Sequence, residues 1–261
     1  MKLNKPQYTN KFVMDVIPIV LDSGETIIPY SIGNLTENEK DEWAKHILAH
    51  YTSKDNIIQG AKLEHCTEEE YIRNRVLPSV TTQAKDVSGN FGEIVFCDFI
   101  EYVLGYNVPR YKLYENMPGN PTQGIDIVAY KKDISKSEND IVIFSEIKSR
   151  LSCKNCKILQ EAINDIAKRK EQDFALALDM ARRKLRDMKN DAEMEDIMRF
   201  QDSEKPCKRL KYAGIITSAD YCTATDFIGV RIESGYKIEA HVLYAKELWL
   251  LVKDLWERAC K

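Results

Sequence analysis

Two apolar segments near the middle of the chain constrain its fold most. They read GIDIVAY (124–130) and DIVIFSEIK (140–148), and the polar, turn-like residues 131–139 lie between them. Short segments rich in β-branched residues are typical of strands, and a polar turn between two of them favours antiparallel pairing. The sequence therefore predicts a β-hairpin in the core of the fold.

Charged residues in this hairpin point to a functional site. Asp126 lies between Ile125 and Ile127, where a carboxylate is costly unless it faces a cleft. Glu146 and Lys148 end the second segment and, being two residues apart, project from the same face of a strand. A Glu-x-Lys tripeptide alone is weak evidence, so the prediction depends on its strand-end position and on the nearby aspartate. The alternative is a solvent-facing Asp126 beside an ordinary surface pair.

This set of side chains suits the hydrolysis of a phosphodiester bond. Mg²⁺ or Mn²⁺ binds carboxylate, carbonyl and water oxygens, and the bound ion polarises the phosphate and activates a water. Asp126, Glu146 and the backbone carbonyl of Ile147 are the candidate ligands. Lys148 would orient the water or stabilise the developing charge. Arg150 is a candidate DNA contact, because it follows Lys148 by two residues.

The segments around the hairpin predict an α/β fold. Helical spacing of apolar residues extends over 88–104 and ends at Gly105, a typical position for a C-cap. The further elements that the sequence predicts are a strand over 110–114, a long helix over 159–189, strands over 209–217 and 236–243, and a C-terminal helix. The core order is α-β-β-β-α-β, which predicts a mixed sheet flanked by helices.

Residues 1–87 are expected to form a separate α+β elaboration on a core of residues 88–261. Its predicted elements are a strand over 12–21 and two helices that open with capping boxes, Thr36 with Glu39 and Thr67 with Glu70. This part carries no recognisable chemistry. We expect it to support the core or to dock a partner.

The run from 88 to 217 resembles the PD-(D/E)XK nuclease superfamily, whose core has this restriction-endonuclease-like order. The resemblance implies that Asp126 and Glu146 bind the metal and that Lys148 is catalytic. Many members carry Gly-Glu in the first core helix, and Gly92-Glu93 matches it, so Glu93 is a further candidate catalytic residue and metal ligand. The alternative for Glu93 is an ordinary exposed helix carboxylate. Ile125 stands where the superfamily label has proline.

Over most of its length the chain is also similar to the HamA-type nuclease subunit of the Hachiman anti-phage defence system. The similarity lies in the FGE helix, the loop and strand around GIDI, and SEIKSR before a long helical region. It implies a DNase that a helicase partner restrains and releases.

The charge balance agrees with a nuclease that depends on a partner protein for much of its affinity for DNA. The net charge is −3, whereas domains that bind nucleic acid unaided usually have a basic excess. Two rival functions remain: a self-sufficient type II restriction endonuclease, and a nuclease-like scaffold without catalysis. The sequence has no stretch of about 18 apolar residues for a membrane span and begins without a signal peptide. We therefore expect a cytoplasmic protein with no membrane contact, for which a homo-oligomer is possible.

Three other patterns carry less weight. Basic residues of the predicted long helix alternate with acidic ones, which favours a solvated face over a DNA contact. Cys153 and Cys156 have zinc-ligand spacing but no matching second pair. His46 and His50 share a helix face, but no HExxH motif accompanies them.

Overall fold

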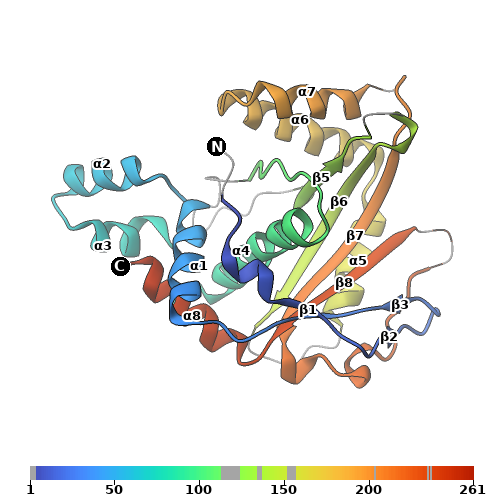
Figure 1. Ribbon diagram of the computed structural model, residues 1–261, viewed down its shortest axis with the longest axis horizontal. Helices are drawn as coiled ribbons and strands as arrows, with labels where there is room; N and C mark the ends of the chain where they lie inside the picture. The colour runs from blue at the N-terminus through green and yellow to red at the C-terminus, as the bar shows by residue number, and fades with distance from the viewer. Residues whose placement is uncertain are drawn as a thin grey trace.

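A six-stranded mixed sheet forms the centre of the protein (Figure 1). The computed structural model describes residues 4–112, 124–133, 137–151, 157–202, 204–233, 235 and 237–261. In spatial order the strands are β1 (Phe12–Met14), β4 (Tyr30–Ile32), β8 (Ile238–Ala245), β7 (Lys208–Ser218), β6 (Ile141–Arg150) and β5 (Ile127–Lys131). The strands from β4 to β6 run parallel, and β1 and β5 are antiparallel to their neighbours. The fold class is therefore the predicted one.

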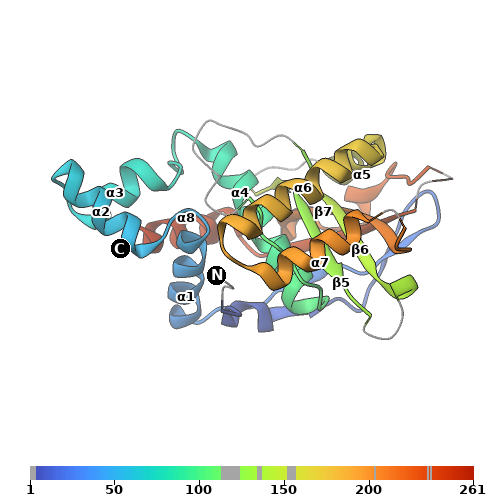
Figure 2. The same cartoon turned by 90° about the horizontal axis from the view of Figure 1, so that it is seen from above.

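Helices cover both faces of this sheet. They are α1 (Glu37–Ala49), α2 (Lys54–Glu64), α3 (Glu68–Tyr71), α4 (Ala84–Asp98), α5 (Ile158–Lys168), α6 (Glu171–Asp187), α7 (Asp191–Gln201) and α8 (Leu248–Ala259). Helix α4 packs on one face and α5 on the other, while α1, α2, α3 and α8 gather at one end of the molecule (Figure 2). None of the helices in the described part of the chain is long and apolar enough to cross a membrane.

Short elements complete the fold. They are the hairpin of β2 (Ile19–Val20) and β3 (Thr26–Ile27), the 3-10 turns Gln7–Lys11, Ser137–Asn139, Ala219–Tyr221 and Ala224–Phe227, and the π-turns Ile72–Val76 and Phe99–Val103.

The alternation of β6 explains why it lies deep in the sheet. Ile143 and Ile147 pack with α4 in one apolar core, whereas Val142 and Phe144 pack with α5 and α6 in a second core. A strand buried on both faces needs the nearly continuous apolar run that the sequence shows. The expected hairpin is confirmed, because β5 pairs antiparallel with β6 and Ile127 lies opposite Ser145.

Two glycines allow α4 to approach the sheet closely. A Cβ on Gly214 of β7 would lie 2.5 Å from the Phe96 ring, and one on Gly92 of α4 would lie 3.0 Å from the Cβ of Ser149. The absence of these side chains brings α4 against the ends of β6 and β7. That approach places the next residue of α4, Glu93, beside the end of the hairpin.

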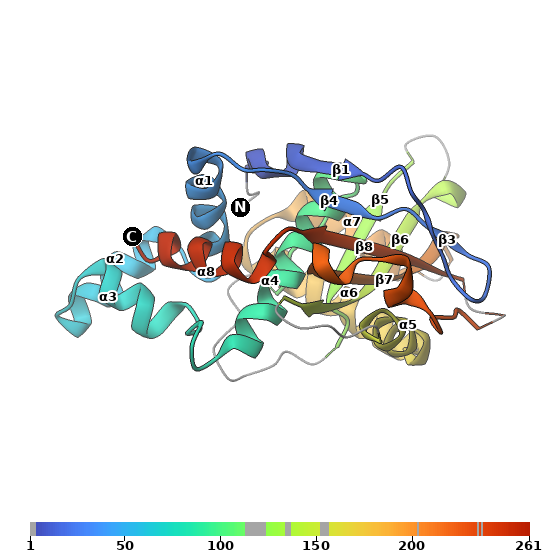
Figure 3. The same ribbon diagram turned by 90° about the horizontal axis from the view of Figure 1, so that it is seen from below.

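The N-terminal part joins the same sheet. Strand β4 pairs parallel with β8, and β1 continues the sheet beyond β4 (Figure 3). Both predicted capping boxes are present, at Thr36 with Glu39 and at Thr67 with Glu70. Helix α1 packs against α8. The division of the chain at residue 87 stays a prediction.

Three predicted elements were wrong in their extent. The strand expected over 12–21 is divided between β1 and β2, which belong to different sheets because they pair with β4 and β3. The strand expected over 110–114 does not form as far as Lys112: Arg110 has a left-handed φ of 48°, and Tyr111 and Lys112 form a turn. Only the bridge of Asn107 with Tyr130 remains there, and residues 113 and 114 lie outside the described part.

The long helix expected over 159–189 is also wrong. It is divided into α5 and α6, because Arg169 adopts an extended backbone with ψ of 133°. Helix α7 follows as an unpredicted third helix. The N-terminal core helix is confirmed: it begins at Ala84, continues through a π-turn and ends before Gly105, whose φ is 76°.

Candidate active site at the end of the β5–β6 hairpin

Asp126 lies immediately before β5, where the hairpin opens. Its backbone N–H donates to the Ser145 carbonyl at 3.1 Å, and its Oδ2 accepts the N–H of Ile147 at 2.8 Å. The Asp126 carboxylate thus accepts the Ile147 N–H in place of a backbone carbonyl of a neighbouring strand. Since the N–H and C=O of one residue in a strand point to the same side, the Ile147 carbonyl is directed toward this end of the hairpin as well.

Glu146 and Lys148 project from the same face of β6, as predicted, but each already has an ionic partner. Glu146 is buried, and its Oε1 lies 2.5 Å from Nη2 of Arg169. Lys148 lies on the solvent side, with its Nζ 2.8 Å from Oδ2 of Asp165 in α5. Both candidate catalytic side chains of β6 therefore form ion pairs with residues of α5 or of the segment just after it.

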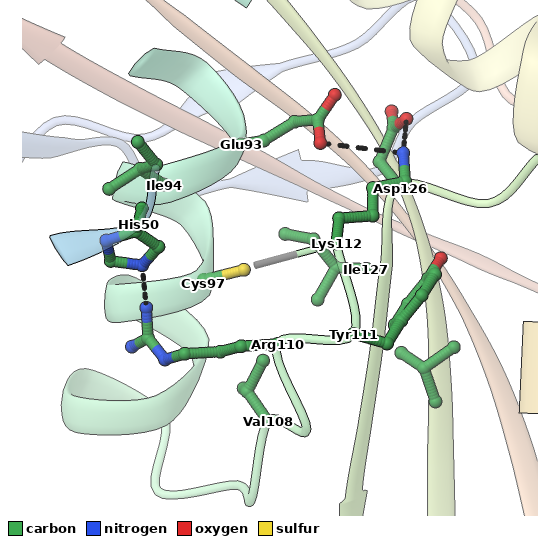
Figure 4. Close-up of a pocket in the computed structure, with 11 residues that line it drawn as sticks. His50, Glu93, Ile94, Cys97, Val108, Arg110, Tyr111, Lys112, Asp126 and Ile127 are labelled. Atoms are coloured by element: carbon green, nitrogen blue, oxygen red, sulfur yellow. Dashed lines mark hydrogen bonds and ion pairs between the residues drawn. The ribbon is translucent and has the colours of Figure 1, made fainter. Parts of the chain in front are cut away.

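Glu93 and Asp126 are joined by a lysine that the sequence reasoning missed. Nζ of Lys112 lies 3.0 Å from Oδ1 of Asp126 and 3.5 Å from Oε2 of Glu93 (Figure 4). The Lys112 side chain is only 8% exposed, so its ammonium is a buried cation between two carboxylates. Glu93 is consequently not the exposed helix carboxylate of the alternative interpretation.

The electrostatics show that negative charge is crowded here. Burial, followed by the charge of Asp126, raises the pKa of Glu93 to about 7 and that of Glu146 to about 8. Burial lowers the pKa of Lys112, but Asp126 and Glu93 outweigh this effect and raise the pKa overall. The nearby cations lower these carboxyl pKa values but do not fully offset the effects of burial and of the Asp126 charge. Such a site favours additional positive charge.

These residues fit a divalent metal ion. A cavity of about 30 Å³, lined by Glu93, Asp126 and Lys112 among others, adjoins the carboxylates, which is room for a water or an ion. Its oxygen donors are of the kind that Mg²⁺ and Mn²⁺ prefer. Lys112 shows by its own position that the pair of carboxylates accepts a cation.

A buried network fixes the segment that delivers Lys112. Arg110 lies 2.5 Å from Asp98 and 2.6 Å from Glu101, and its Nη1 contacts His50 at 2.6 Å. His46 contacts Asp98 at 2.9 Å from the other side. His46, His50 and Asp98 are close enough together to hold a metal ion, but the Arg110 guanidinium already contacts two of them. The Arg110 guanidinium therefore occupies this cluster and fixes the segment that carries Lys112.

Arg169 corrects the interpretation of the basic helical region. Its Nε donates to Glu146 at 2.7 Å, and its Nη2 donates to the Gly124 carbonyl at 3.0 Å. It can do so because the helix is interrupted at this residue. Arg182 and Arg183, by contrast, pair with Asp179 on the surface of α6, as expected of a solvated face. The Cys153–Cys156 pair lies outside the described residues.

The sequence contains no signal for the ionic partners of the candidate catalytic residues, which are Lys112, Arg169 and Asp165. Lys112 belonged to an expected strand, and Arg169 and Asp165 to the charged face of an expected helix. Arg150, the predicted DNA contact, is 43% exposed at its side chain and lies 3.9 Å from Glu161. Its position leaves it accessible to a substrate.

Comparison with known families gives a match over most of the chain. The sequence model of the HamA family matches residues 8–246, a span that includes Glu93, Asp126, Glu146 and Lys148. No curated protein matches the chain.

Proposed function

The chain belongs to the HamA family and is thus a component of anti-phage defence, and from this premise we propose that it is a metal-dependent DNA endonuclease of the PD-(D/E)XK type. The observation that carries the proposal is the arrangement at the end of the hairpin. The carboxylates of Asp126 and Glu93 both contact the Lys112 ammonium group, and Glu146 and Lys148 lie on the adjoining strand β6. An anti-phage protein with such a site is suited to cutting DNA.

In this proposal Asp126, Glu146 and the Ile147 carbonyl hold Mg²⁺ or Mn²⁺, with Glu93 as a further ligand. The bound ion supplies a polarised phosphate and a water of lowered pKa. Lys148 projects on the same side as Glu146, and its ammonium would orient the attacking water or stabilise the negative charge that develops on the phosphate oxygens.

The surrounding cations keep the carboxylates in place. Arg169 donates from Nε to Glu146 and from Nη2 to the Gly124 carbonyl. It thereby holds the Glu146 carboxylate against the end of the hairpin. Asp165 holds the Lys148 ammonium on the α5 side. Orientation of this kind contributes to the rate, because misplaced groups lose much of their catalytic effect.

The acidic balance of the chain supports a partner. A net charge of −3 gives little long-range attraction to DNA. We propose that a helicase subunit supplies this attraction and controls access of DNA to the site.

The test is DNA cleavage by variants of the purified chain together with its partner. Glu146→Gln and Lys148→Ala should each reduce plasmid cleavage with Mg²⁺ by about 10²- to 10³-fold, the range for loss of a group that stabilises charge in the transition state. Glu195→Gln, in the exposed part of α7, is the matched control and should cut at the normal rate. Unchanged cleavage and phage protection in both site variants would refute the catalytic role of Glu146 and Lys148. A ladder of discrete fragments would instead favour a restriction endonuclease.

A further inference from the structure

A groove of about 360 Å³ opens beside the candidate active site. Its walls are the first half of α4, the end of β6, the start of α5, and Trp249 at the beginning of α8. Ile147 and Lys148 line it as well, so it leads directly from the candidate catalytic residues. A nucleic-acid strand whose scissile phosphate lies beside Lys148 can extend along this groove.

The groove is basic in an acidic protein. Lys85, Lys148 and Arg150 line it, whereas Glu161 is the acidic residue among its described lining residues. Lys85 is exposed near the start of α4. The hydroxyl of Ser88, one helical turn from Lys85 and bonded to that of Ser149, adds a neutral polar group. Such a lining attracts a chain of phosphates.

At Gly89 the backbone of α4, without a side chain, lines the groove. This glycine lies inside α4, where glycine weakens a helix, and a Cβ built on it would meet nothing within 4 Å. Packing therefore does not require a glycine here, in contrast to Gly92 and Gly214. The missing side chain keeps the helix backbone open to close approach from the groove, one turn before Glu93.

Trp249 offers a ring at the other wall. Trp43 and Trp256 are buried at 0% and 3% exposure, but Trp249 is half-buried and lines the groove. The Nζ of Lys253 lies 5.4 Å from its ring centroid. An aromatic ring among cations is the usual means of holding an unpaired base, because every base can stack on it.

We propose that this groove binds a single-stranded segment of the DNA substrate. Lys85 and Arg150 bind its phosphates, the backbone passes close to Gly89, and one base stacks on Trp249. A paired base in a duplex is stacked on its neighbours and does not present a free face to the ring. The proposal rests on the proposed nuclease function, since it describes how a strand reaches Lys148.

Intrinsic fluorescence tests this path without any cleavage. The full chain is titrated with oligothymidylate at low salt in EDTA. Binding should quench the emission, because Trp249 is the tryptophan that a base can reach. Trp249→Ala should remove the quenching and, measured by anisotropy of a labelled oligonucleotide, bind about tenfold more weakly.

Variants of the α4 wall separate binding from folding. Lys85→Ala should reduce the slope of log affinity against log salt by about 0.7, the value for one phosphate of a single strand. Lys62→Ala, an exposed lysine of α2, should leave the slope unchanged. Gly89→Ala should bind more weakly although its melting temperature rises, since alanine favours the helix.

Several results would overturn the proposal. They are an absence of binding at low salt, binding without quenching, a salt slope that Lys85→Ala leaves unchanged, or tighter binding of the matching duplex. The nuclease proposal fails separately, because its test is cleavage. A chain that binds the oligonucleotide as described but never cuts DNA would retain the groove and lose the catalytic function.

Discussion

Replacement of Lys112 by methionine is the sharpest test of the candidate metal site. Methionine keeps an unbranched apolar side chain and removes the ammonium that lies 3.0 Å from Asp126 and 3.5 Å from Glu93. At an effective dielectric constant of about 20, each contact has a gross attraction of about 5 kcal/mol. Much of this attraction offsets the cost of burying the charges, and removal of one partner of a buried pair typically costs about 3–5 kcal/mol.

We expect the lower end of that range for the metal-free protein. Glu93, whose pKa burial and Asp126 already raise, can take up a proton when the lysine is lost. A loss of about 3 kcal/mol lowers the melting temperature by roughly 6–12 °C in a chain of this size. Divalent metal should then stabilise Lys112→Met more than the native chain, because the ion no longer competes with an ammonium group for the same oxygens.

The assay is thermal unfolding in EDTA and over a series of Mn²⁺ concentrations. Lys40→Met is the matched control: Lys40 also lies between two carboxylates, Glu37 at 2.8 Å and Asp254 at 3.4 Å, but on the surface. Its loss should cost at most about 1 kcal/mol and leave the response to metal unchanged. Equal metal-induced shifts in the native chain and in Lys112→Met would refute the idea that lysine and metal share these carboxylates.

Three further predictions concern activity, pH and packing. Asp165→Asn releases the ammonium of Lys148 and should lower kcat about tenfold with little change in KM; an unchanged kcat in single-turnover cleavage would show that this ion pair has no positioning role. Burial lowers the pKa of His50 to about 3, with the Arg110 charge adding to the effect, and lowers that of His241 to about 4. The unfolded chain therefore binds more protons at each of these histidines below about pH 6.5, whereas the raised pKa values of Glu93 and Glu146 act in the opposite direction. The test therefore compares the native chain with His241→Gln in urea unfolding: between about pH 6.5 and pH 4 the variant should lose stability less steeply, by about 1.4 kcal/mol per pH unit, and equal slopes in the two chains would contradict it. Gly214→Ala places a Cβ against an aromatic ring of α4 and should cost about 1–3 kcal/mol in chemical denaturation, and a neutral result would mean that α4 can shift away from the sheet.

The candidate site was partly predictable from the sequence. The common face of Glu146 and Lys148 on β6 follows from strand periodicity alone. Asp126 was expected inside the first strand of the hairpin and lies immediately before β5. Glu93 entered through a family resemblance, and the close approach of α4 explains its place. The ionic partners of these four residues had no signal in local sequence.

Local sequence determined the elements whose signals lie within a few residues. The capping boxes at Thr36 and Thr67 formed as predicted, because their hydrogen bonds are made within a single helical turn. The β5–β6 hairpin also formed as predicted, since its two apolar strands follow one another closely in the sequence. The strand over 12–21 failed because its two halves pair with different strands, which residue spacing does not specify.

Only the tertiary structure decided where the charges meet. Arg169 reaches Glu146 from 23 residues away and Lys112 reaches Asp126 from 14 residues away. Both contacts form because an unpaired buried carboxylate is costly, and the burial itself arises when α4, the sheet and α5 pack together. Periodicity shows which side chains share a face of a strand or helix, but the cation that compensates each carboxylate is determined only by the packed fold.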